Sequence, residues 1–349
     1  MANNIREELT PILAAIQIVS PASFLFCEKP VPVAPITSPT MPGFPNHPLP
    51  AMPLVRQLQM TLYTTCYARR FNRQQAEPDT NTTIGTDPAF VQQLSQNNNT
   101  AMRWEGGWTI YSVLAGGQVL LVKGDRQRSA MPGEFVTAGP PGMPPQMGAS
   151  VNVQVLREST AAQPGFYFAY GDTLSDIWDE HNLLRFYFHA PAPLAPPLLG
   201  YLTQSFNRYQ IAFRLKALDA PHMYGRTDAV VLYVAKRYYE IALRLIARMP
   251  FTLAAGLEPS VPLFARMVQP GVGMAEDPNN GESFGMNRCR MVAEGIVDAW
   301  SQGKESVEDR LTAIASRFAQ TGFNLDLPHL SPTSMDFAET QEHVEFAYA

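Results

Sequence analysis

Two stretches decide the fold: LRFYFHA at residues 184–190 and QIAFRLKAL at residues 210–218. Side chains of a β-strand point alternately to its two faces, and apolar residues alternate with other residues in both stretches. We therefore predict two strands that each bury one face in a core. The side chains expected to point into that core are Leu184, Phe186 and Phe188 in the first strand, and Ile211, Phe213 and Leu215 in the second.

The other face of these strands gathers polar and charged residues. It carries Arg185, Tyr187 and His189 on the first strand, and Arg214 and Lys216 on the second. Guanidinium and ammonium groups that share one sheet face can bind an anion. The pattern indicates a site for an anionic substrate, but it does not identify the reaction.

Length and composition exclude several classes of protein. A chain of 349 residues is expected to form one large domain with a variable N-terminal part, or two domains. Hydrophobic residues make up 46% and aromatic residues 10%, which is enough for a sizeable core. Charged residues make up only 16%, the net charge is −5, and no block of Lys or Arg occurs. We therefore expect neither a nucleic-acid partner nor an anionic membrane surface, although a local cationic pocket is compatible with this charge.

Cysteine and histidine usage predicts a cytoplasmic protein without a metal or another cofactor. Cys27, Cys66 and Cys289 form no C-x-x-C pair, and the six histidines form no H-E-x-x-H pattern. Residues 3–19 contain an apolar stripe, and we interpret them as an amphipathic helix, with a secretion signal as the alternative. No apolar run reaches the roughly 18 to 20 residues that a transmembrane helix needs.

The remaining pattern predicts an α+β fold, with a mixed or antiparallel sheet and helices packed on it. A proline-rich segment at residues 29–53 is expected to be extended, as a strap over the surface or as a docking segment for a partner. We expect further helices at residues 54–73, 88–94, 236–249, 283–302 and 306–321. We expect a β-hairpin at residues 107–136 and strands at 151–155, 165–171 and 229–234.

This order of elements predicts four regions of the chain. They are an N-terminal helix with the proline-rich strap at 1–53, a helix and β-hairpin part at 54–150, a core that carries the site at 151–330, and an acidic tail at 331–349.

Lys216 is the first candidate for chemistry, because its strand neighbours Phe213 and Leu215 anchor its stem and a neutral lysine can act as a general base. The alternative is a solvated lysine on an exposed face. His189 is a candidate acid, and His222 is a second; either can instead be a structural histidine.

Two polar motifs add candidates for anion binding. In YGRTDA, Arg226 can grip an oxyanion while Asp228 orients it, or the two can form an ordinary ion pair. In GESFGMNRCR, Ser283 is expected to cap a helix whose free N–H groups, with Arg288 and Arg290, could cradle a phosphate. The alternative is a capped helix with surface arginines. No Walker A sequence and no G-x-S-x-G elbow occurs.

Three motifs in this order resemble the HopA1-like family: F-x-x-K at Phe213–Lys216, R-x-D-A at Arg226–Ala229 and GESFG at Gly281–Gly285. The resemblance is densest from Leu184 to Trp300 and does not cover the first 53 residues. This family includes a plant-pathogen type III effector and bacterial proteins encoded beside peptide-modifying enzymes. Members in lanthipeptide and thioamitide pathways are assigned as phosphoserine/phosphothreonine lyases, which act after a separate kinase has phosphorylated a precursor peptide.

The resemblance implies roles for the candidate residues. Lys216 would be the base that removes the Cα proton, and His189 or His222 the acid. Tyr187 or Tyr224 would donate to the enolate oxygen. The phosphate clamp would be drawn from Arg185, Arg214, Arg226, Arg288 and Lys236. Two alternatives remain open: an effector or adaptor without catalytic activity, and a scaffold that binds the phosphopeptide without converting it.

Overall fold

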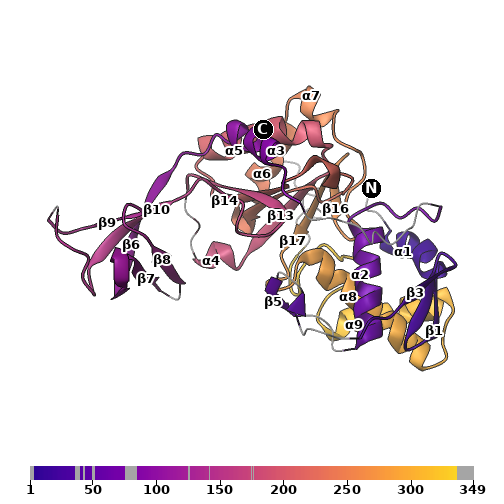
Figure 1. Cartoon of the computed structure of the whole chain (residues 1–349). Coiled ribbons are helices and arrows are strands. Elements are labelled where there is room, and N and C mark those ends of the chain that lie inside the picture. The colour runs from indigo at the N-terminus through magenta and orange to yellow at the C-terminus, as the bar shows by residue number, and fades with distance from the viewer. Residues whose placement is uncertain are drawn as a thin grey trace, which may run out of the picture.

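The computed structural model has three parts, which can be followed in Figure 1: a central sheet, a small sheet that projects to one side, and a helical lobe on the other side. The structure describes residues 4–35, 40–41, 44–48, 52–74, 85–124, 126–140, 142–173, 175 and 177–335.

The central sheet has seven strands in the order β11-β12-β14-β15-β13-β17-β16, and all its neighbouring strands are antiparallel. This confirms the predicted α+β fold. The strands are β11 (Glu158–Ser159), β12 (Phe166–Tyr170), β13 (Leu183–Phe188), β14 (Phe213–Leu218), β15 (Val230–Ala235), β16 (Arg266–Gln269) and β17 (Val272–Glu276).

One face of this sheet packs on helices and forms a hydrophobic core. The helices are α3 (Pro88–Asn97), α5 (Ala195–Arg208) and α6 (Tyr239–Ala247), which lie above the sheet in Figure 1. The apolar side chains predicted to point inward from residues 184–190 and 210–218 all belong to this core. The alternation in those two stretches is therefore confirmed, and their polar positions face the other way.

The helical lobe packs against the other face of the sheet. It consists of α1 (Ile5–Ala14), β1 (Ile16–Ser20), β2 (Ser23–Phe26), β3 (Lys29–Pro32), α2 (Pro53–Leu62), the π-helical turn η1 (Tyr63–Tyr67), α8 (Phe284–Ser301) and α9 (Val307–Gln320). Tyr187, Val231 and Tyr233 of the sheet belong to the same hydrophobic core as these elements. The lobe therefore covers part of the face that carries the polar residues.

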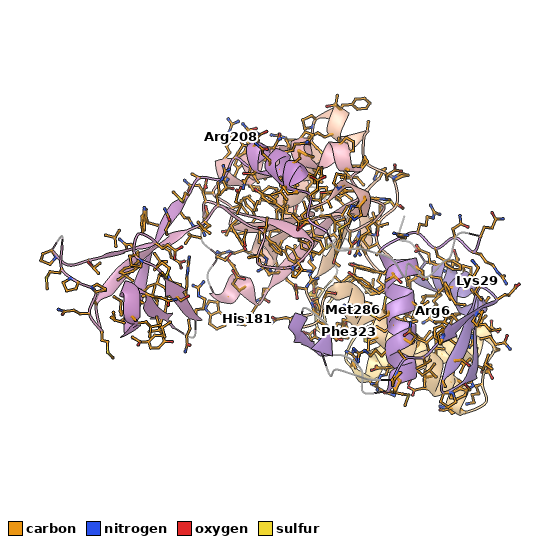
Figure 2. All side chains as sticks on the ribbon, viewed as in Figure 1. Arg6, Lys29, His181, Arg208, Met286 and Phe323 are labelled. Atoms are coloured by element: carbon orange, nitrogen blue, oxygen red, sulfur yellow. The ribbon has the colours of Figure 1, made fainter. Side chains whose placement is uncertain are left out.

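Polar contacts join the early and late segments of this lobe. Arg6 of α1 and Phe323, which follows α9, both lie in it (Figure 2). Arg6 Nε donates to Asp326 Oδ1 at 2.6 Å. The buried Arg310 of α9 donates to the backbone oxygen of Ile16 at 2.6 Å. The predicted N-terminal helix thus belongs to one packed unit with α9.

Two predicted helices are wrong in their extent. The helix predicted over residues 3–19 ends at Ala14, and Ile16–Ser20 forms β1, because its buried and exposed residues alternate when it pairs with β2. The helix predicted over 54–73 leaves α-geometry after Leu62. Thr64 Oγ1 bonds back to the Met60 oxygen at 2.9 Å, a local competition that distorts helices.

The small sheet has five strands in the order β8-β7-β6-β10-β9 and its own core around Trp108 and Val153. It projects away from the central sheet in Figure 1. The predicted strand 151–155 pairs here and not with the central sheet. The strands are β6 (Arg103–Val113), β7 (Val119–Lys123), β8 (Arg126–Ala130), β9 (Phe135–Thr137) and β10 (Ser150–Val155).

The proline-rich segment contributes extended chain where the structure describes it. Strand β3 lies at the edge of the three-stranded sheet, where a proline costs no ladder hydrogen bond. Strands β4 (Thr40–Met41) and β5 (Phe44–Pro48) pair with each other, and the rest of the segment lies mostly outside the described residues. The predicted acidic tail is described only as far as residue 335. In the described chain, no helix combines the length and the apolar character needed to cross a membrane.

Candidate anion site on the central sheet

Cross-strand pairing places three polar side chains in one row at the centre of the sheet. Tyr233 of β15 lies opposite Arg214 of β14 on one side and opposite Arg185 of β13 on the other. In the next row on the same face, Val231 lies between Lys216 and Tyr187. Directly opposed residues in a sheet hold their side chains close together. The two strands that the sequence singled out therefore contribute to one site, and a tyrosine of β15 lies between them.

Three cations surround the ring of Tyr233. The Cζ atoms of Arg214 and Arg185 lie 4.7 Å and 5.2 Å from the ring centroid, and Lys216 Nζ lies 6.0 Å from it. These separations allow cation–π contacts. The side chain of Lys216 also crosses Phe166, whose ring centroid is 4.4 Å from Nζ. We call Arg185, Arg214, Lys216 and Tyr233 the cationic tyrosine cluster.

The charges of the cluster control the pKa of Tyr233. Only 6% of this residue is exposed, and burial alone would raise the pKa of its hydroxyl. The charges of Lys216, Arg185 and Arg214 outweigh burial and lower that pKa below its ordinary value of 10.0. For Tyr187, one row away, burial dominates and raises the pKa. Proximity to three cations therefore distinguishes Tyr233 from its neighbour on the same face.

One carboxylate neutralises part of the positive charge. Asp277, directly after β17, accepts from Nε and Nη2 of Arg185, with the Nε contact at 2.8 Å. Within the described part of the chain, neither Arg214 nor Lys216 forms an ion pair, and both are half-buried. The cluster therefore keeps an excess of positive charge, which an anion would balance.

Arg226 and Asp228 form an ion pair at the border of the cluster. Arg226 donates to the two oxygens of Asp228 at 2.8 Å and 2.9 Å, and to Tyr63 Oη at 3.0 Å. Burial would raise the pKa of Asp228, but the charges of Arg226 and Lys216 lower it. Asp228 is therefore ionised, and its two oxygens hold Arg226 in place.

The start of α8 covers the site from the lobe. Ser283 caps this helix as predicted, and its Oγ accepts from the Met286 N–H at 3.3 Å. The rings of Phe284 and Tyr67 lie 6.2 Å and 6.4 Å from that of Tyr187. The Tyr187 hydroxyl is buried and has no hydrogen-bond partner in the described structure. The Ser283 side chain is thus occupied by its cap, and aromatic rings separate the helix start from the cluster.

Three predicted phosphate-binding side chains are held elsewhere by other groups. Arg288 is fully buried and donates to the backbone oxygens of Pro328 at 2.7 Å and Leu330 at 2.9 Å. Burial lowers its pKa to about 9. Arg290 binds Glu282 at 2.7 Å and also Glu294, and Lys236 binds Glu276 at 2.7 Å. The structure therefore does not bring these three cations into the cluster.

The two candidate histidines also lie apart from the cluster. His189 Nδ1 lies 3.0 Å from Ser260 Oγ, and burial lowers the pKa of its imidazole, which favours the neutral ring. His222 is exposed in the turn Pro221–Met223. Tyr224 belongs to the core on the opposite face, where its hydroxyl donates to the Leu218 oxygen at 2.8 Å. None of these three side chains is a member of the cationic tyrosine cluster.

A cavity of about 490 Å³ lies near His189 but does not include any member of the cluster. Ser260, which holds His189, is part of its wall together with Cys66 and Arg70. Within the residues that the structure describes, no group of three or more His, Cys, Asp or Glu side chains could hold a metal ion.

Tyr233 is the member of the cluster that sequence reasoning missed. It lies in AVVLYV, a continuous apolar run that predicts a buried strand and gives no sign of a site. Its position becomes informative only with the strand order β14-β15-β13, which places it between two arginines. That order depends on contacts between distant parts of the chain.

Parts of the chain are similar to known proteins. A search of curated proteins found no match. Two solved structures described as effector proteins from Pseudomonas syringae, of pv. tomato strain DC3000 and pv. syringae strain 61, are similar to part of the chain. Their sequence identities are 17% and 16%, with TM-scores of 0.36 and 0.35. Each alignment covers 48% of this chain and 63% of the other chain.

A family model matches the part of the chain that contains the cluster. It describes the HopA1 effector protein family and matches residues 157–330. The match begins just before β11 and includes the whole central sheet with α8 and α9, whereas α1, α2 and the small sheet lie outside it. Through residues 157–330, just under half of its length, the chain therefore matches the HopA1 effector protein family.

Proposed function

We propose that this protein is a phosphoserine/phosphothreonine lyase that eliminates phosphate from a kinase-phosphorylated precursor peptide. The product would be dehydroalanine or dehydrobutyrine in a lanthipeptide- or thioamitide-type peptide. The observation that carries this proposal is the buried sheet face on which Arg185, Arg214 and Lys216 surround Tyr233 with one neutralising carboxylate. The resemblance of its motifs to lyases of this family supports the same reaction.

The cluster suits the charge of the substrate. A phosphomonoester carries nearly two negative charges at neutral pH. Arg214 presents a planar fork of N–H donors and has no carboxylate partner in the described structure, so it is available to bind phosphate oxygens. Arg185 is aligned by Asp277 and adds a second guanidinium to the same row. Together they would form the phosphate clamp.

Lys216 would be the base of the elimination. In its neutral form, the amine can accept the proton from Cα of the phosphorylated residue, and the C–H electron pair then forms the double bond as phosphate departs. Its stem is fixed by strand β14 and by the ring of Phe166. Asp228 lies close enough to Lys216 for their charges to interact.

The proposed setting is the bacterial cytoplasm, with a separate Ser/Thr kinase as a partner that supplies the phosphopeptide. A second function uses the same cluster without turnover: an adaptor, or an effector of the kind named by the family description, that binds phosphopeptides. The excess of cations favours phosphate binding in either case, and only conversion of the peptide separates the two.

Mass spectrometry of a phosphothreonine peptide distinguishes these functions. The pure full chain, with the cognate kinase and precursor peptide, should convert phosphopeptide to a product that a thiol can trap. Lys216→Met should bind the phosphopeptide but leave it intact, whereas Lys304→Met, which removes an exposed lysine after α8, should behave as wild type. Tight binding without conversion by the wild type would favour the adaptor and reject the lyase.

A further inference from the structure

We infer that Tyr233 is the general acid of the reaction, donating its phenolic proton to the bridging oxygen of the departing phosphate. This inference rests on the proposed lyase function and assigns a role to a residue that neither the motifs nor the comparisons single out. It starts from the position of Tyr233 between the two arginines that would hold the phosphate and beside the lysine that would take the Cα proton.

The elimination needs an acid because of the charge on the leaving group. A phosphomonoester dianion that leaves without a proton would depart as the phosphate trianion, which is a poor leaving group. Protonation of the bridging oxygen lets it leave as hydrogen phosphate instead. The required group must therefore be protonated before the reaction and tolerate a negative charge after it.

The surroundings of Tyr233 suit a group that must carry a negative charge after the reaction. Its phenolate would form beside Arg185, Arg214 and Lys216, and Lys216 becomes charged as it takes the Cα proton. The charged groups that act on it are Lys216 and Arg214 from β14, Arg185 from β13 and Asp277 after β17, and only the last disfavours the phenolate. These cations outweigh burial, so the same electrostatics that lowers the pKa of Tyr233 would stabilise the phenolate in the transition state.

The other candidate acids lack this arrangement. His189 is held by Ser260, and burial lowers the pKa of its imidazole, which favours the neutral ring over imidazolium, the stronger acid. His222 is exposed, and the hydroxyl of Tyr224 lies on the opposite face of the sheet. Tyr187 lies next to the cluster, but its raised pKa makes its phenolate costly.

Atoms and electrons balance in this sequence. Lys216 takes the Cα proton, the C–H pair becomes the Cα–Cβ double bond, and the Cβ–O pair leaves with the phosphate oxygen. That oxygen takes the proton of Tyr233, so hydrogen phosphate departs and a phenolate remains. Lys216 then returns its proton to the phenolate, and both groups are restored without a further reactant.

Tyr233→Phe is the direct test because it removes the hydroxyl and keeps the ring between the cations. We expect kcat for the phosphopeptide to fall by roughly 100-fold or more, the usual contribution of a general acid, with little change in KM. Tyr201→Phe is the matched control: Tyr201 is half-buried on the helix-covered face of the sheet, where its hydroxyl donates to the Leu245 oxygen of α6. If the wild type is active and kcat of Tyr233→Phe lies within about threefold of the wild-type kcat, the inference is overturned and the lyase proposal stands.

A change of leaving group separates acid catalysis from a structural role. Sulfate departs without a proton, so a peptide with O-sulfoserine in place of phosphoserine needs no acid. The defect of Tyr233→Phe relative to wild type should shrink at least tenfold on this substrate. An equal defect on both substrates would show that Tyr233 only shapes the site. A wild type that converts neither substrate would overturn both the lyase proposal and this role.

A spectroscopic titration tests the basis of the inference without turnover. In wild type and Tyr201→Phe, the phenolate absorption should show one tyrosine that ionises below the ordinary pKa of about 10. Tyr233→Phe should lack this early titration. If all three proteins titrate alike, the cations do not stabilise the phenolate and the inference fails.

Discussion

Gly285 gives a quantitative test of how the start of α8 packs over the site. A Cβ added at this position would lie 2.3 Å, 2.5 Å and 2.6 Å from Cε1, Cζ and Cδ1 of Tyr67. The Tyr67 ring cannot easily move, because it is buried, stacks on Tyr63 with a centroid separation of 5.3 Å, and meets the edge of Tyr187. The glycine of the GESFG motif is therefore required by a close approach of helix and ring.

The magnitude follows from two opposed effects. Overpacking of a filled core costs about 1 to 3 kcal/mol, and a clash with a fixed ring belongs in the upper half of this range. Replacing glycine with alanine inside a helix stabilises the helix by about 1 kcal/mol. We expect Gly285→Ala to lower the free energy of unfolding by about 1 to 2 kcal/mol, measured by urea denaturation.

Two variants make this prediction refutable. Gly225→Ala is the control, since nothing lies within 4 Å of the Cβ that it adds. In a Tyr67→Leu background the ring is gone, so Gly285→Ala should be neutral or stabilising, and the double-mutant cycle should report the clash as a coupling energy. A Gly285→Ala protein about 1 kcal/mol more stable than wild type would refute the packing account, because helix propensity would then be the only effect.

Three further predictions concern charged groups. Arg290→Met leaves the buried Glu282 without its main partner, which should cost about 3 kcal/mol at neutral pH in urea denaturation. Burial would raise the pKa of Glu282, but Arg290 lowers it, so this stability is present above the ordinary pKa of 4.5 and is lost as pH falls through the lowered value. A difference from wild type that stays constant below pH 4.5 would contradict this linkage. Arg214→Met should weaken binding of a phosphopeptide by roughly 10- to 100-fold in calorimetry, because a hydrogen bond to a charged group is worth about 1.5 to 3 kcal/mol. Binding of the unphosphorylated peptide should not change. An equal loss of affinity for both peptides would count against a phosphate contact. Arg310→Met removes the donor to two buried backbone oxygens, those of Leu13 and Ile16. It should lower the free energy of unfolding by about 2 kcal/mol. An unchanged urea midpoint would show that these contacts are not needed for stability.

Alternation along single strands was readable from the sequence, because a strand fixes the direction of each side chain with no knowledge of its neighbours. That is why the inward set from Leu184 to Leu215 and the polar face with Arg214 and Lys216 were predicted. The cap at Ser283 could also be predicted, since it depends on the four consecutive residues 283–286. In each case the interaction that decides the structure is local.

Contacts with residues from distant segments could not be predicted from the sequence. Arg288 and Lys236 look like free cations in the sequence, but carbonyl groups of residues 328 and 330 and the carboxylate of Glu276 hold them. Tyr233 looks like a core residue until the strand order places it between two arginines. The strand β1 was missed for the same reason, because its pairing with β2 overrides the helical pattern that precedes it.

The most direct test of the central claim is the mass of a phosphothreonine peptide after incubation with the pure protein and its kinase. The proposed lyase predicts loss of phosphoric acid, which leaves a dehydrobutyrine that adds a thiol, and no such loss with Lys216→Met. Loss of metaphosphoric acid alone, which restores threonine, would mean hydrolysis in place of elimination. An unchanged mass of a bound phosphopeptide would contradict the lyase and leave the cationic tyrosine cluster as a binding site.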